Sequence, residues 1–579
     1  MKIALAQLNY HIGNLEANTQ KIIQAIEQAK QQKADLIVFA ELAICGYPPL
    51  DLLEFTNFID LCEHAVEQIA GVCDNIACII GAPVRNTDLK GKDLYNSAVF
   101  IENKKRKATI YKTLLPNYDV FDECRYFEPS VATKIHCIDL MGFKIALTIC
   151  EDLWNMNHNP LYVESPMDIL IREKPDLMIN IAASPFSYRH HKERVSVLKN
   201  NCHQYNLPLF YVNQVGAQTE IIFDGRSLVF DKQGHVVDEM PGFTEAMHYY
   251  NLTVPFSREI DIHPQHKSSK TKNFDQVRSE QKGGLDIAAP KETSVLGIED
   301  AMPFIHDALI LGIQDYFKKS GFSKAILGLS GGIDSALVCV LASKALGPEN
   351  VMAVLMPSEF SSDHSIKDAL DLVENLGCKH EIISVKKAVS AFDVMMKPLF
   401  NDLPFNIAEE NIQSRCRAVT VMAMSNKFGY ILLNTSNKSE LAVGYGTLYG
   451  DMAGAMGVIG DIYKIQVYQL CEYINRDQEI IPKNILIKPP SAELRPGQKD
   501  SDSLPTYDVL DQILFEYIEL KKSPSAIIAL GFEEVLVYRI LKLVNAAEFK
   551  RYQTPPILRV SPKAFGLGRR MPIVGKYLF

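Results

Sequence analysis

KAILGLSGGIDS, residues 324–335, decides the fold of the second half of the chain. It joins a strand-length apolar run, 324–329, through a glycine turn to a helix that we expect over 334–346. Another strand-like run follows at 351–356. A strand, a helix and a second strand in this order predict an α/β domain built around a sheet.

The hexapeptide SGGIDS, residues 330–335, has the composition of an anion-binding turn. Two glycines let the backbone approach an anion closely, and the N–H groups and dipole of the following helix attract it. Ser330 and Ser335 can donate further hydrogen bonds, and Asp334 can hold Mg²⁺, which prefers oxygen ligands. The pattern G-x-x-x-x-G-K-[ST] does not occur here, so the turn is not a Walker P-loop. A bare S-G-G would be no more than a glycine turn.

The first 255 residues also alternate strand-like and helical segments. Apolar runs at 2–8 and 34–40 flank a segment, 17–32, whose apolar residues fall on one helical face. More strand-like runs follow at 77–81, 96–101, 143–149, 177–182 and 208–212. This half is therefore expected to be an α/β domain with helices covering a sheet.

A polar stretch separates the two halves. Residues 257–295 include HPQHKSSKTKNFDQVRSEQKGG, which is poor in apolar residues and has no period, as is typical of a linker. We therefore expect one domain at 1–256 and another at 296–579. The chain has 579 residues, of which 47% are hydrophobic and 22% charged, so it can bury two cores.

Bulk properties argue against several classes of protein. The net charge of −9 gives no reason to expect nucleic-acid binding. The 12 cysteines include no C-x-x-C pair, which argues against structural zinc and favours buried thiols in a reducing compartment. No uncharged apolar stretch reaches about 18 residues, and no signal peptide is evident. We expect a cytoplasmic protein with no membrane span.

Three residues of the first half with complementary chemistry lie at or near the ends of strand-like runs. Glu41 ends ADLIVFAE, Lys112 lies in ATIYKTLLPN, and Cys150 ends FKIALTIC. Side chains at the ends of parallel strands converge on one edge of a sheet. Cys150 would attack an amide carbon, Glu41 would take the thiol proton, and Lys112 would stabilise the oxyanion and the thiolate. A buried thiol, a capping carboxylate and a snorkelling ammonium are the ordinary alternatives, and position alone does not exclude them.

The first half resembles the nitrilase, or carbon–nitrogen hydrolase, superfamily over about residues 1–255. The matching text is FAELAICGYPPLDLL, YKTLLPNYDVFDECRYF and LTICEDLW. The resemblance implies a four-layer α-β-β-α sandwich and a catalytic triad at Glu41, Lys112 and Cys150. It also implies a second glutamate, Glu123, that orients or tunes the lysine.

The glutaminase members of this superfamily imply a glutamine site. NIAASPFSYRHHKER resembles their substrate loop, which places Ser184 near the glutamine, as LPNYDVF places Tyr118. Where members commonly have S-P-F-x-x-G-K/R, this chain has Arg189 and His190. His190 would contact the glutamine carboxylate, with Arg189 or Lys192 compensating for the change.

A second departure lies in NQVGAQTEIIFDGRS, which resembles a segment usually written G-G-x-D-E. Ala217 and Thr219 replace the second glycine and the aspartate, while Glu220 is retained. The recognition of glutamine is therefore less firmly predicted than the triad.

SGGIDS resembles the pyrophosphate loop of the N-type ATP pyrophosphatases, which split ATP into AMP and pyrophosphate while adenylylating a substrate. The resemblance implies a doubly wound parallel sheet. GMP, asparagine and argininosuccinate synthetases and tRNA-modifying enzymes share the loop, so it does not identify the substrate. The implied ATP-binding residues are Gly328, Leu329, Ser330, Gly331, Gly332, Ile333, Asp334, Ser335 and Thr435.

Further text resembles the NAD⁺ synthetases across nearly all of residues 296–579. The matching segments are 409–419, 434–464, 489–511 and 549–573. One departure occurs at 434–437, where the family's G-T-G-N or S-T-G-N appears as N-T-S-N. The resemblance implies Mg²⁺ on Asp334 and Glu440. The residues implied at deamido-NAD⁺ are Asn411, Glu440, Tyr445, Gly446, Thr447, Leu448 and Lys550, with Arg415, Arg417 and Asp451 available nearby.

The tail 549–579 holds seven basic residues and no acidic ones. Such a run is either a solvated face or a set of anion contacts. Lys550 would reach the dinucleotide, whereas tRNA binding is the weaker alternative.

The two resemblances complement each other. Cys150 would release ammonia from glutamine, and the second half would adenylylate the nicotinate carboxylate of deamido-NAD⁺ with ATP and then amidate it to NAD⁺. Family members assemble as homo-oligomers. Free ammonia is mostly NH₄⁺ at neutral pH, so a shielded route between the sites is a further hypothesis.

Two alternatives remain open at this point. One is an ATP-pyrophosphatase amidotransferase that acts on another nucleotide or on tRNA. The other is a binding or scaffold protein with an inactive glutaminase half.

Overall fold

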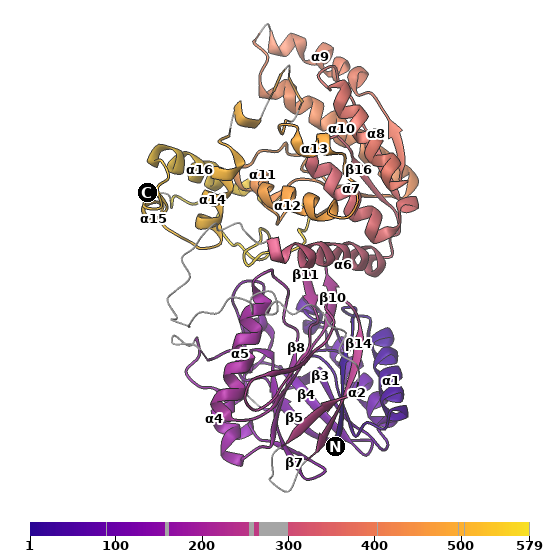
Figure 1. Ribbon diagram of the computed structural model, residues 1–579, viewed down its shortest axis with the longest axis vertical. Coiled ribbons are helices and arrows are strands. Elements are labelled where there is room, and N and C mark those ends of the chain that lie inside the picture. Colours follow the sequence, from indigo (N-terminus) through magenta and orange to yellow (C-terminus); the bar gives the residue numbers. More distant parts are fainter. Residues whose placement is uncertain are drawn as a thin grey trace. The chain divides into compact units, whose positions relative to one another are not determined.

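The computed structural model describes all residues except 89, 157–160, 254–259, 266–298, 402, 492, 496, 499, 503 and 578–579. The described chain forms two compact units (Figure 1). The first comprises Met1–Phe186, His190–Gln218 and Phe223–Glu292, and the second comprises Ser187–Arg189, Thr219–Ile222 and Thr293–Phe579. Most of the expected linker, 257–295, lies outside the described residues, but its residues Asp261–Pro264 form strand β15, which pairs with β14 in the first unit.

The first unit is a four-layer α-β-β-α sandwich with two large sheets. The seven-stranded sheet has the order β15-β14-β1-β2-β3-β4-β5, and the six-stranded sheet has the order β13-β12-β9-β8-β7-β6. The strands are β1 Lys2–Gln7, β2 Leu36–Val38, β3 Ala77–Arg85, β4 Leu94–Glu102, β5 Lys105–Tyr111, β6 Ile138–Leu140, β7 Phe143–Ile149, β8 Leu177–Ala182, β9 Leu209–Asn213, β10 Val215–Gln218, β11 Ile221–Asp224, β12 Leu228–Phe230, β13 Val236–Glu239 and β14 Ala246–Thr253. The strand-like runs of the sequence therefore correspond to β1–β4 and β7–β9.

The core of this unit lies between the two sheets. Ile3 and Val38 of one sheet belong to the same buried cluster as Leu147 and Phe210 of the other. Helices α1 (Leu15–Gln31) and α2 (Thr56–Val72) cover the first sheet, and α4 (Pro166–Leu170) and α5 (His190–Tyr205) cover the second (Figure 1). Because both faces of each sheet are covered at its centre, strands such as β3 and β8 are mostly apolar and buried, whereas the edge strand β5 (KRKATIY) is largely polar and partly exposed.

The second unit contains a five-stranded parallel sheet of order β18-β17-β16-β19-β20, with helices on both of its faces. The strands are β16 Ala325–Gly328, β17 Val351–Leu355, β18 Lys379–Ile382, β19 Ile431–Asn434 and β20 Met456–Gly457. The chain moves outward from β16 in one direction and from β19 in the other, so the order reverses between them. A crevice opens at the carboxyl ends of strands at such a reversal, and here those ends lead into SGGIDS and Thr435.

Helices complete the second unit. They are α6 Met302–Ser320, α7 Ile333–Leu346, α8 Asp363–Leu376, α9 Lys386–Phe400, α10 Ile407–Phe428, α11 Lys438–Val443, α12 Lys464–Ile474, α13 Lys483–Ile487, α14 Tyr507–Ile518, α15 Pro524–Ile528, α16 Glu534–Ala546 and α17 Glu548–Arg551. Helices α11, α14 and α16 pack around a second apolar cluster. Among the helices in the described part of the chain, none is long and apolar enough to cross a membrane.

The start of α7 differs from the starts of several other long helices. Asn14 caps α1, Ser362 caps α8, and Asn406 forms a capping box with Glu409 at α10. Helix α7 follows Gly332 directly, and no side chain caps it. Its first N–H groups thus remain oriented towards an acceptor that the helix does not supply itself.

Candidate active sites

Glu41, Lys112 and Glu123 form a buried charged cluster in the first unit. Lys112 Nζ lies 2.7 Å from Glu41 Oε1 and 2.7 Å from Glu123 Oε1. The Tyr47 hydroxyl donates to Glu123 Oε1 at 2.9 Å. The structure thus brings together two carboxylates and one ammonium that the sequence places on separate strands and loops.

Burial and charge act against each other in this cluster. Burial raises the pKa of Glu123 to about 7, although the nearby Lys112 ammonium opposes the rise. Burial disfavours the charged form of Lys112, but the carboxylates of Glu123 and Glu41 outweigh it and raise the pKa of the lysine well above its usual value. The lysine therefore remains an ammonium.

Asn96, which lies on β4, connects the two carboxylates. Its Nδ2 donates to Glu41 Oε1 at 2.7 Å and to Glu123 Oε2 at 3.2 Å. The backbone N–H of Ala183 donates to the other oxygen of Glu41, Oε2, at 3.0 Å. Asn96 is fully buried, and nothing in the sequence around it singles it out.

Gly81 on β3 makes the position of Glu41 possible. A Cβ at residue 81 would lie 2.2 Å from the amide nitrogen of Leu42 and 2.5 Å from the carbonyl oxygen of Ala40. Such a contact cannot be relieved by a side-chain rotation, because both atoms belong to the backbone. Only glycine allows the chain around Glu41 to pack this closely against β3.

Cys150 directly follows β7 and has a backbone φ of 41°. This left-handed conformation is uncommon for a residue other than glycine and is a form of strain found at functional sites. Burial, with the charge of Glu41, raises the pKa of the Cys150 thiol well above its usual value, while Lys112 opposes the rise. The resting group is therefore a thiol, which needs a base to become a nucleophile.

Asp152 ties the segment after Cys150 to the segment after Lys112. Its Oδ1 accepts the backbone N–H groups of Thr113 at 3.0 Å and Leu114 at 2.9 Å, and its Oδ2 accepts that of Ile149 at 3.0 Å. The carboxylate is buried. These bonds fix the backbone just before Cys150 and just after Lys112.

Glu151 is a second residue that the sequence reasoning missed. Its carboxylate accepts the hydroxyl of Tyr118 at 2.9 Å and that of Tyr162 at 3.1 Å. Burial raises the pKa of Glu151 to about 7. An acidic residue next to a nucleophile was visible in CEDLW, and its inward orientation could not be read from the sequence.

Ser184 and His190, both predicted near glutamine, contact each other. Ser184 Oγ lies 2.9 Å from His190 Nε2, and the imidazole stacks on Trp154 with ring centroids 4.9 Å apart. Asn213 holds the Ser184 backbone by accepting its N–H at 2.8 Å and donating to its carbonyl at 3.1 Å. Burial lowers the pKa of His190, with the Glu193 carboxylate opposing the change.

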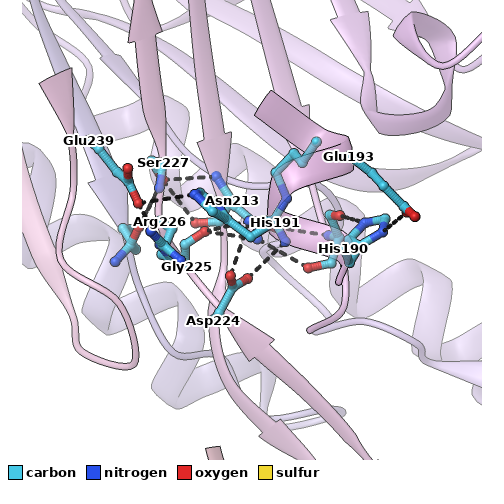
Figure 2. Close-up of polar contacts among 12 residues, drawn as sticks. His190, His191, Glu193, Asn213, Asp224, Gly225, Arg226, Ser227 and Glu239 are labelled. Atoms are coloured by element: carbon cyan, nitrogen blue, oxygen red, sulfur yellow. Dashed lines mark hydrogen bonds and ion pairs between the residues drawn. The ribbon is translucent and has the colours of Figure 1, made fainter. Parts of the chain in front are cut away.

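Figure 2 shows the polar network around His190 and Asn213. Arg194, which is fully buried, pairs with Asp224 at 2.9 Å. Arg226 pairs with Glu239, which also lies 3.5 Å from His191. Cations are thus present beside the altered substrate loop, but these contacts already hold them to carboxylates.

Two of the other departures, Arg189 and Thr219, fall in segments that group with the second unit, as does the retained Glu220. There the Arg189 guanidinium lies 4.9 Å from the centroid of the Phe515 ring. Thr219 has a left-handed φ of 57°. Glu220 Oε1 accepts the backbone N–H of Ile557 at 3.3 Å. Arg189 and Glu220 therefore already have contacts within the second unit. Ala217 lies in β10 of the first unit and is buried.

The SGGIDS loop of the second unit is held by hydrogen bonds among its own residues. Ser330 Oγ lies 3.1 Å from Ser335 Oγ and accepts the N–H of Gly332 at 3.2 Å. Gly331 has a φ of 75°, and a Cβ there would lie 2.2 Å from the carbonyl oxygen of Ser365. The loop therefore depends on glycine at 331 for both its conformation and its packing.

Asp334 and Glu440 lie on either side of a buried lysine. Lys464 Nζ pairs with Asp334 Oδ2 and lies 3.9 Å from Glu440 Oε1. The Asn437 amide donates to the other oxygen of Asp334 at 2.9 Å. Burial and the charge of Asp334 raise the pKa of Glu440 well above its usual value. Lys464 was not singled out from the sequence.

A cavity of about 770 Å³ connects these groups. Most of the predicted nucleotide-binding residues line it, and Gly331 and Leu448 do not. Lining residues from the predicted set are Gly328, Leu329, Ser330, Gly332, Ile333, Asp334, Ser335, Asn411, Thr435, Glu440, Tyr445, Gly446, Thr447 and Lys550. A cavity of this size suits a small-molecule ligand.

The predicted dinucleotide residues form a connected wall of this cavity. The Thr447 hydroxyl donates to Asn411 Oδ1 at 2.7 Å, and the Tyr445 hydroxyl donates to Asp500 at 3.3 Å. Lys550 Nζ donates to the carbonyls of Gly444 at 2.8 Å and Gly446 at 2.7 Å. The side chain of Leu448 instead packs against the apolar cluster formed by α11, α14 and α16.

Two more cavity residues were missed from the sequence. Lys488 Nζ donates to the Gly331 carbonyl at 3.0 Å and to Ser365 Oγ at 2.7 Å. Glu493 accepts the Ser365 hydroxyl at 2.7 Å. Lys488 thus adds a cation directly beside the SGGIDS loop.

The basic tail is only partly accounted for by the two alternatives considered for it. Arg551 and Arg569 are buried, and each lies 2.6 Å from Glu548 Oε2. Glu548 lies immediately before residue 549, so the count of charged residues in the tail did not include it. These two arginines stabilise the fold rather than form a solvated face.

Both halves of the chain match known families. A model described as carbon-nitrogen hydrolase matches residues 2–260, and one described as NAD synthase matches residues 305–554. A glutamine-dependent NAD(+) synthetase of Synechocystis sp. is 46% identical over 99% of this chain and 98% of its own length. The protein of the same name from Thermotoga maritima is 38% identical over 100% of this chain and 99% of its own.

A solved structure shows the same architecture. It is the glutamine-dependent NAD+ synthetase of Acinetobacter baumannii in complex with ADP, which is 35% identical to this chain. The TM-score is 0.73, and the match covers 99% of this chain and 98% of that one. The similarity therefore extends through both units.

Proposed function

The chain belongs to the glutamine-dependent NAD⁺ synthetases, and from that premise we propose which residues perform each step. The enzyme is a ligase that releases ammonia from glutamine in its first half. In its second half it activates deamido-NAD⁺ with ATP and amidates it to NAD⁺, AMP and pyrophosphate. The alternative that the chain is a non-catalytic binding or scaffold protein is therefore excluded.

The first step is attack by Cys150 on the side-chain amide of glutamine. Glu41 takes the thiol proton, because the pKa of the buried thiol is too high for it to ionise unaided. Lys112 uses two N–H groups on Glu41 and Glu123, which leaves its third for the developing oxyanion. The proton on Glu41 then passes to the leaving nitrogen, ammonia departs, and water cleaves the glutamyl thioester.

Glu151 and Ser184 are placed to recognise the two ends of the amino acid. Glu151 is a buried carboxylate held by Tyr118 and Tyr162, and its charge would attract the α-ammonium of glutamine. Ser184 and His190, joined at 2.9 Å, offer hydrogen-bond donors for the carboxylate end. Neutral donors at that end would replace the lysine or arginine common in the family.

The second step is attack by the nicotinate carboxylate on the α-phosphorus of ATP. Pyrophosphate leaves into the SGGIDS loop, where the α7 N–H groups, Ser330 and Lys488 stabilise its charge. Ammonia then attacks the acyl adenylate and AMP leaves. The wall formed by Asn411, Tyr445 and Thr447 holds the nicotinate side, with Lys550 beside it.

Asp334 and Glu440 are the residues that would hold Mg²⁺. The donor set fits, because Mg²⁺ binds through one or two carboxylates plus phosphate oxygens and water. Burial and then the charge of Asp334 raise the pKa of Glu440 even though Lys464 opposes the rise, so a divalent cation would relieve the repulsion that remains. When bound, the ion would neutralise charge on the transferring phosphates.

The observation that carries this proposal is the buried Glu41–Lys112–Glu123 cluster beside Cys150. Its test is NAD⁺ formation from deamido-NAD⁺, ATP and Mg²⁺ with either glutamine or ammonium. We expect Cys150→Ala to lose the glutamine-dependent reaction and keep the ammonium-dependent one. Cys73→Ala, which alters another buried thiol of the same unit, should keep both. Retention of glutamine use by Cys150→Ala would remove Cys150 from the mechanism.

Asp334→Ala should lose synthesis from both nitrogen sources, because both need the adenylate. ATP–pyrophosphate exchange tests the acyl substrate in the same enzyme. Exchange should depend on deamido-NAD⁺, and exchange driven by another nucleotide or by tRNA would favour the competing amidotransferase.

We also propose that the enzyme is a cytoplasmic homo-oligomer. All 12 cysteines are free thiols, as expected in a reducing compartment. Helix α9 has no buried residue, and its apolar side chains Val394, Met395 and Leu399 are each more than half exposed. Exposed apolar side chains gathered on one helix are what a subunit interface would cover. Light scattering on the purified enzyme measures the oligomer directly, and a mass of 64.9 kDa would correspond to a monomer.

A further inference from the structure

Asn96 donates both of its amide hydrogens to carboxylates. One bond runs to Glu41 Oε1 at 2.7 Å and the other to Glu123 Oε2 at 3.2 Å. The opposite end of the side chain, Oδ1, is buried and has no hydrogen-bond partner among the described residues. A buried acceptor without a partner costs stability. The opposite orientation of the amide would be worse, because it would turn Oδ1 towards the two carboxylates, which cannot donate to it. The donors therefore fix the orientation of Asn96.

The donors around Glu41 are distributed unequally between its two oxygens. Oε1 accepts from both Lys112 and Asn96, at 2.7 Å each. Within the part of the chain that the structure describes, Oε2 accepts only the backbone N–H of Ala183, at 3.0 Å. A carboxylate oxygen offers about two acceptor sites. Oε1 is thus filled, and Oε2 retains a site for one more proton.

We propose that Asn96 is a positioning residue of the glutaminase reaction, which holds the Glu41 and Glu123 carboxylates in one fixed arrangement and directs the Cys150 proton to Glu41 Oε2. Its amide satisfies two carboxylates at once, so it offsets part of their mutual repulsion. It also occupies the oxygen of Glu41 that would otherwise compete for the proton. Asn96 itself does not contact the reacting atoms. The inference rests on the proposed roles of Glu41 and Cys150.

Several other titratable groups face the same two carboxylates. Lys112 follows β5, Tyr47 follows β2, and Cys150 and Glu151 follow β7. Each is retained when Asn96 is changed. A change in pH dependence on replacing Asn96 alone therefore reports on its two hydrogen bonds.

The test uses Asn96→Leu, which keeps the approximate volume and removes both donors. Burial already raises the pKa of Glu123 to about 7, and without the Asn96 donor its ionised form is still less favourable, so the acid limb of kcat/KM for glutamine should move up by about one pH unit. At pH 7 the loss in kcat/KM should be at most about 10-fold, and it should shrink at pH 9. Ammonium-dependent synthesis in the same sample should not change.

Asn96→Asp supplies a second variant of nearly identical shape. It introduces a third carboxylate in place of the donor, so the acid limb should move further than in Asn96→Leu. Alkylation of Cys150 by iodoacetamide, followed by peptide mass spectrometry, reads the thiol without glutamine. Alkylation at pH 7 should be slower in both variants.

Asn18→Leu is the matched control for the loss of a buried amide. Asn18 donates to two backbone carbonyls, of His11 at 2.9 Å and Ile44 at 3.0 Å, and is nearly fully buried. It should lower the thermal unfolding temperature without moving the pH profile. If Asn96→Leu folds and its acid limb stays at the wild-type pH, Asn96 has only a structural role. If instead Cys150→Ala keeps glutamine use, the proposed function fails independently of Asn96.

Discussion

Glu151 places a carboxylate where folding and substrate binding make opposite demands. Burial raises its pKa to about 7 in the folded enzyme, against an ordinary value of 4.5. The folded state therefore holds more protons than the unfolded state between these values, and stability falls as the pH rises through that window. Above pH 7 the group destabilises the fold by about 3 kcal/mol.

Glu151→Gln should therefore raise the free energy of unfolding at pH 8 and leave it nearly unchanged at pH 4. It should also raise KM for glutamine by about 10- to 100-fold, because it removes a charged partner of the α-ammonium. Urea unfolding at the two pH values and glutamine kinetics at pH 8 measure both effects. A variant with unaltered KM would show that Glu151 does not bind the amino group.

Gly81→Ala tests the close packing behind Glu41. The added methyl group would overlap backbone atoms at 2.2 and 2.5 Å, so the peptide that carries Glu41 must move. We expect glutamine-dependent synthesis to fall at least about 100-fold, since a displacement near 1 Å is enough for that loss. Ammonium-dependent synthesis should persist.

Gly71→Ala is the control for this change. Gly71 lies within α2, and no atom lies within 4 Å of the place that the added methyl group would take, so the substitution should increase stability. Equal glutamine activity in the two variants would mean that the Gly81 contact does not hold Glu41 in place.

At the scale of elements, part of the order could be predicted from the sequence, namely β1–β4 and β7–β9 with α1 in the first unit and β16, α7 and β17 in the second. Apolar runs identified β1 and β7, and the turn SGGIDS predicted the junction of β16 and α7. These are local patterns of period and turn chemistry, which the fold does not override. The four-layer arrangement came instead from family resemblance.

The site could be predicted only in part. Glu41, Lys112 and Cys150 stood at strand ends in recognisable text, whereas Asn96 stands inside β4 among apolar residues and looks like an ordinary strand position. Lys464 and Lys488 gain their roles only from tertiary contacts with Asp334 and Gly331. No local pattern encodes a contact between residues so far apart in the chain.

The loop before α7 should be more sensitive to substitution than an ordinary helix boundary. Gly331→Ala forces a left-handed φ of 75° on a residue with a Cβ and places that atom 2.2 Å from the Ser365 carbonyl. We expect synthesis from both glutamine and ammonium to fall at least about 100-fold. ATP–pyrophosphate exchange should fall with it.

Gly377→Ala distinguishes the effect of a left-handed backbone conformation from the effect of a steric clash of the added Cβ. Gly377 ends α8 with a φ of 70°, but nothing lies within 4 Å of an added Cβ. It should cost about 1 kcal/mol of stability and leave both activities intact. If it inactivated the enzyme as Gly331→Ala does, backbone strain alone would explain the loss.

At the scale of the whole molecule, one chain carries an ammonia-producing site and an ammonia-consuming site. Ammonia that escaped into neutral water would be protonated and lose its nucleophilicity. We therefore expect the nitrogen of ¹⁵N-amide glutamine to reach NAD⁺ with little dilution by unlabelled ammonium present at the same concentration. Mass spectrometry of the product measures the isotope ratio, and free mixing of the two pools would exclude a shielded route.

The absence of a side chain at residue 81 also has a consequence for how such enzymes diverge. Every single-nucleotide change of a glycine codon that specifies another amino acid adds a Cβ, so no one-step replacement at this position leaves the peptide of Glu41 undisturbed. A lineage that abandons glutamine as its nitrogen source is released from this restriction. Among relatives that keep both halves, a residue other than glycine at this site should mark those that have come to rely on free ammonia.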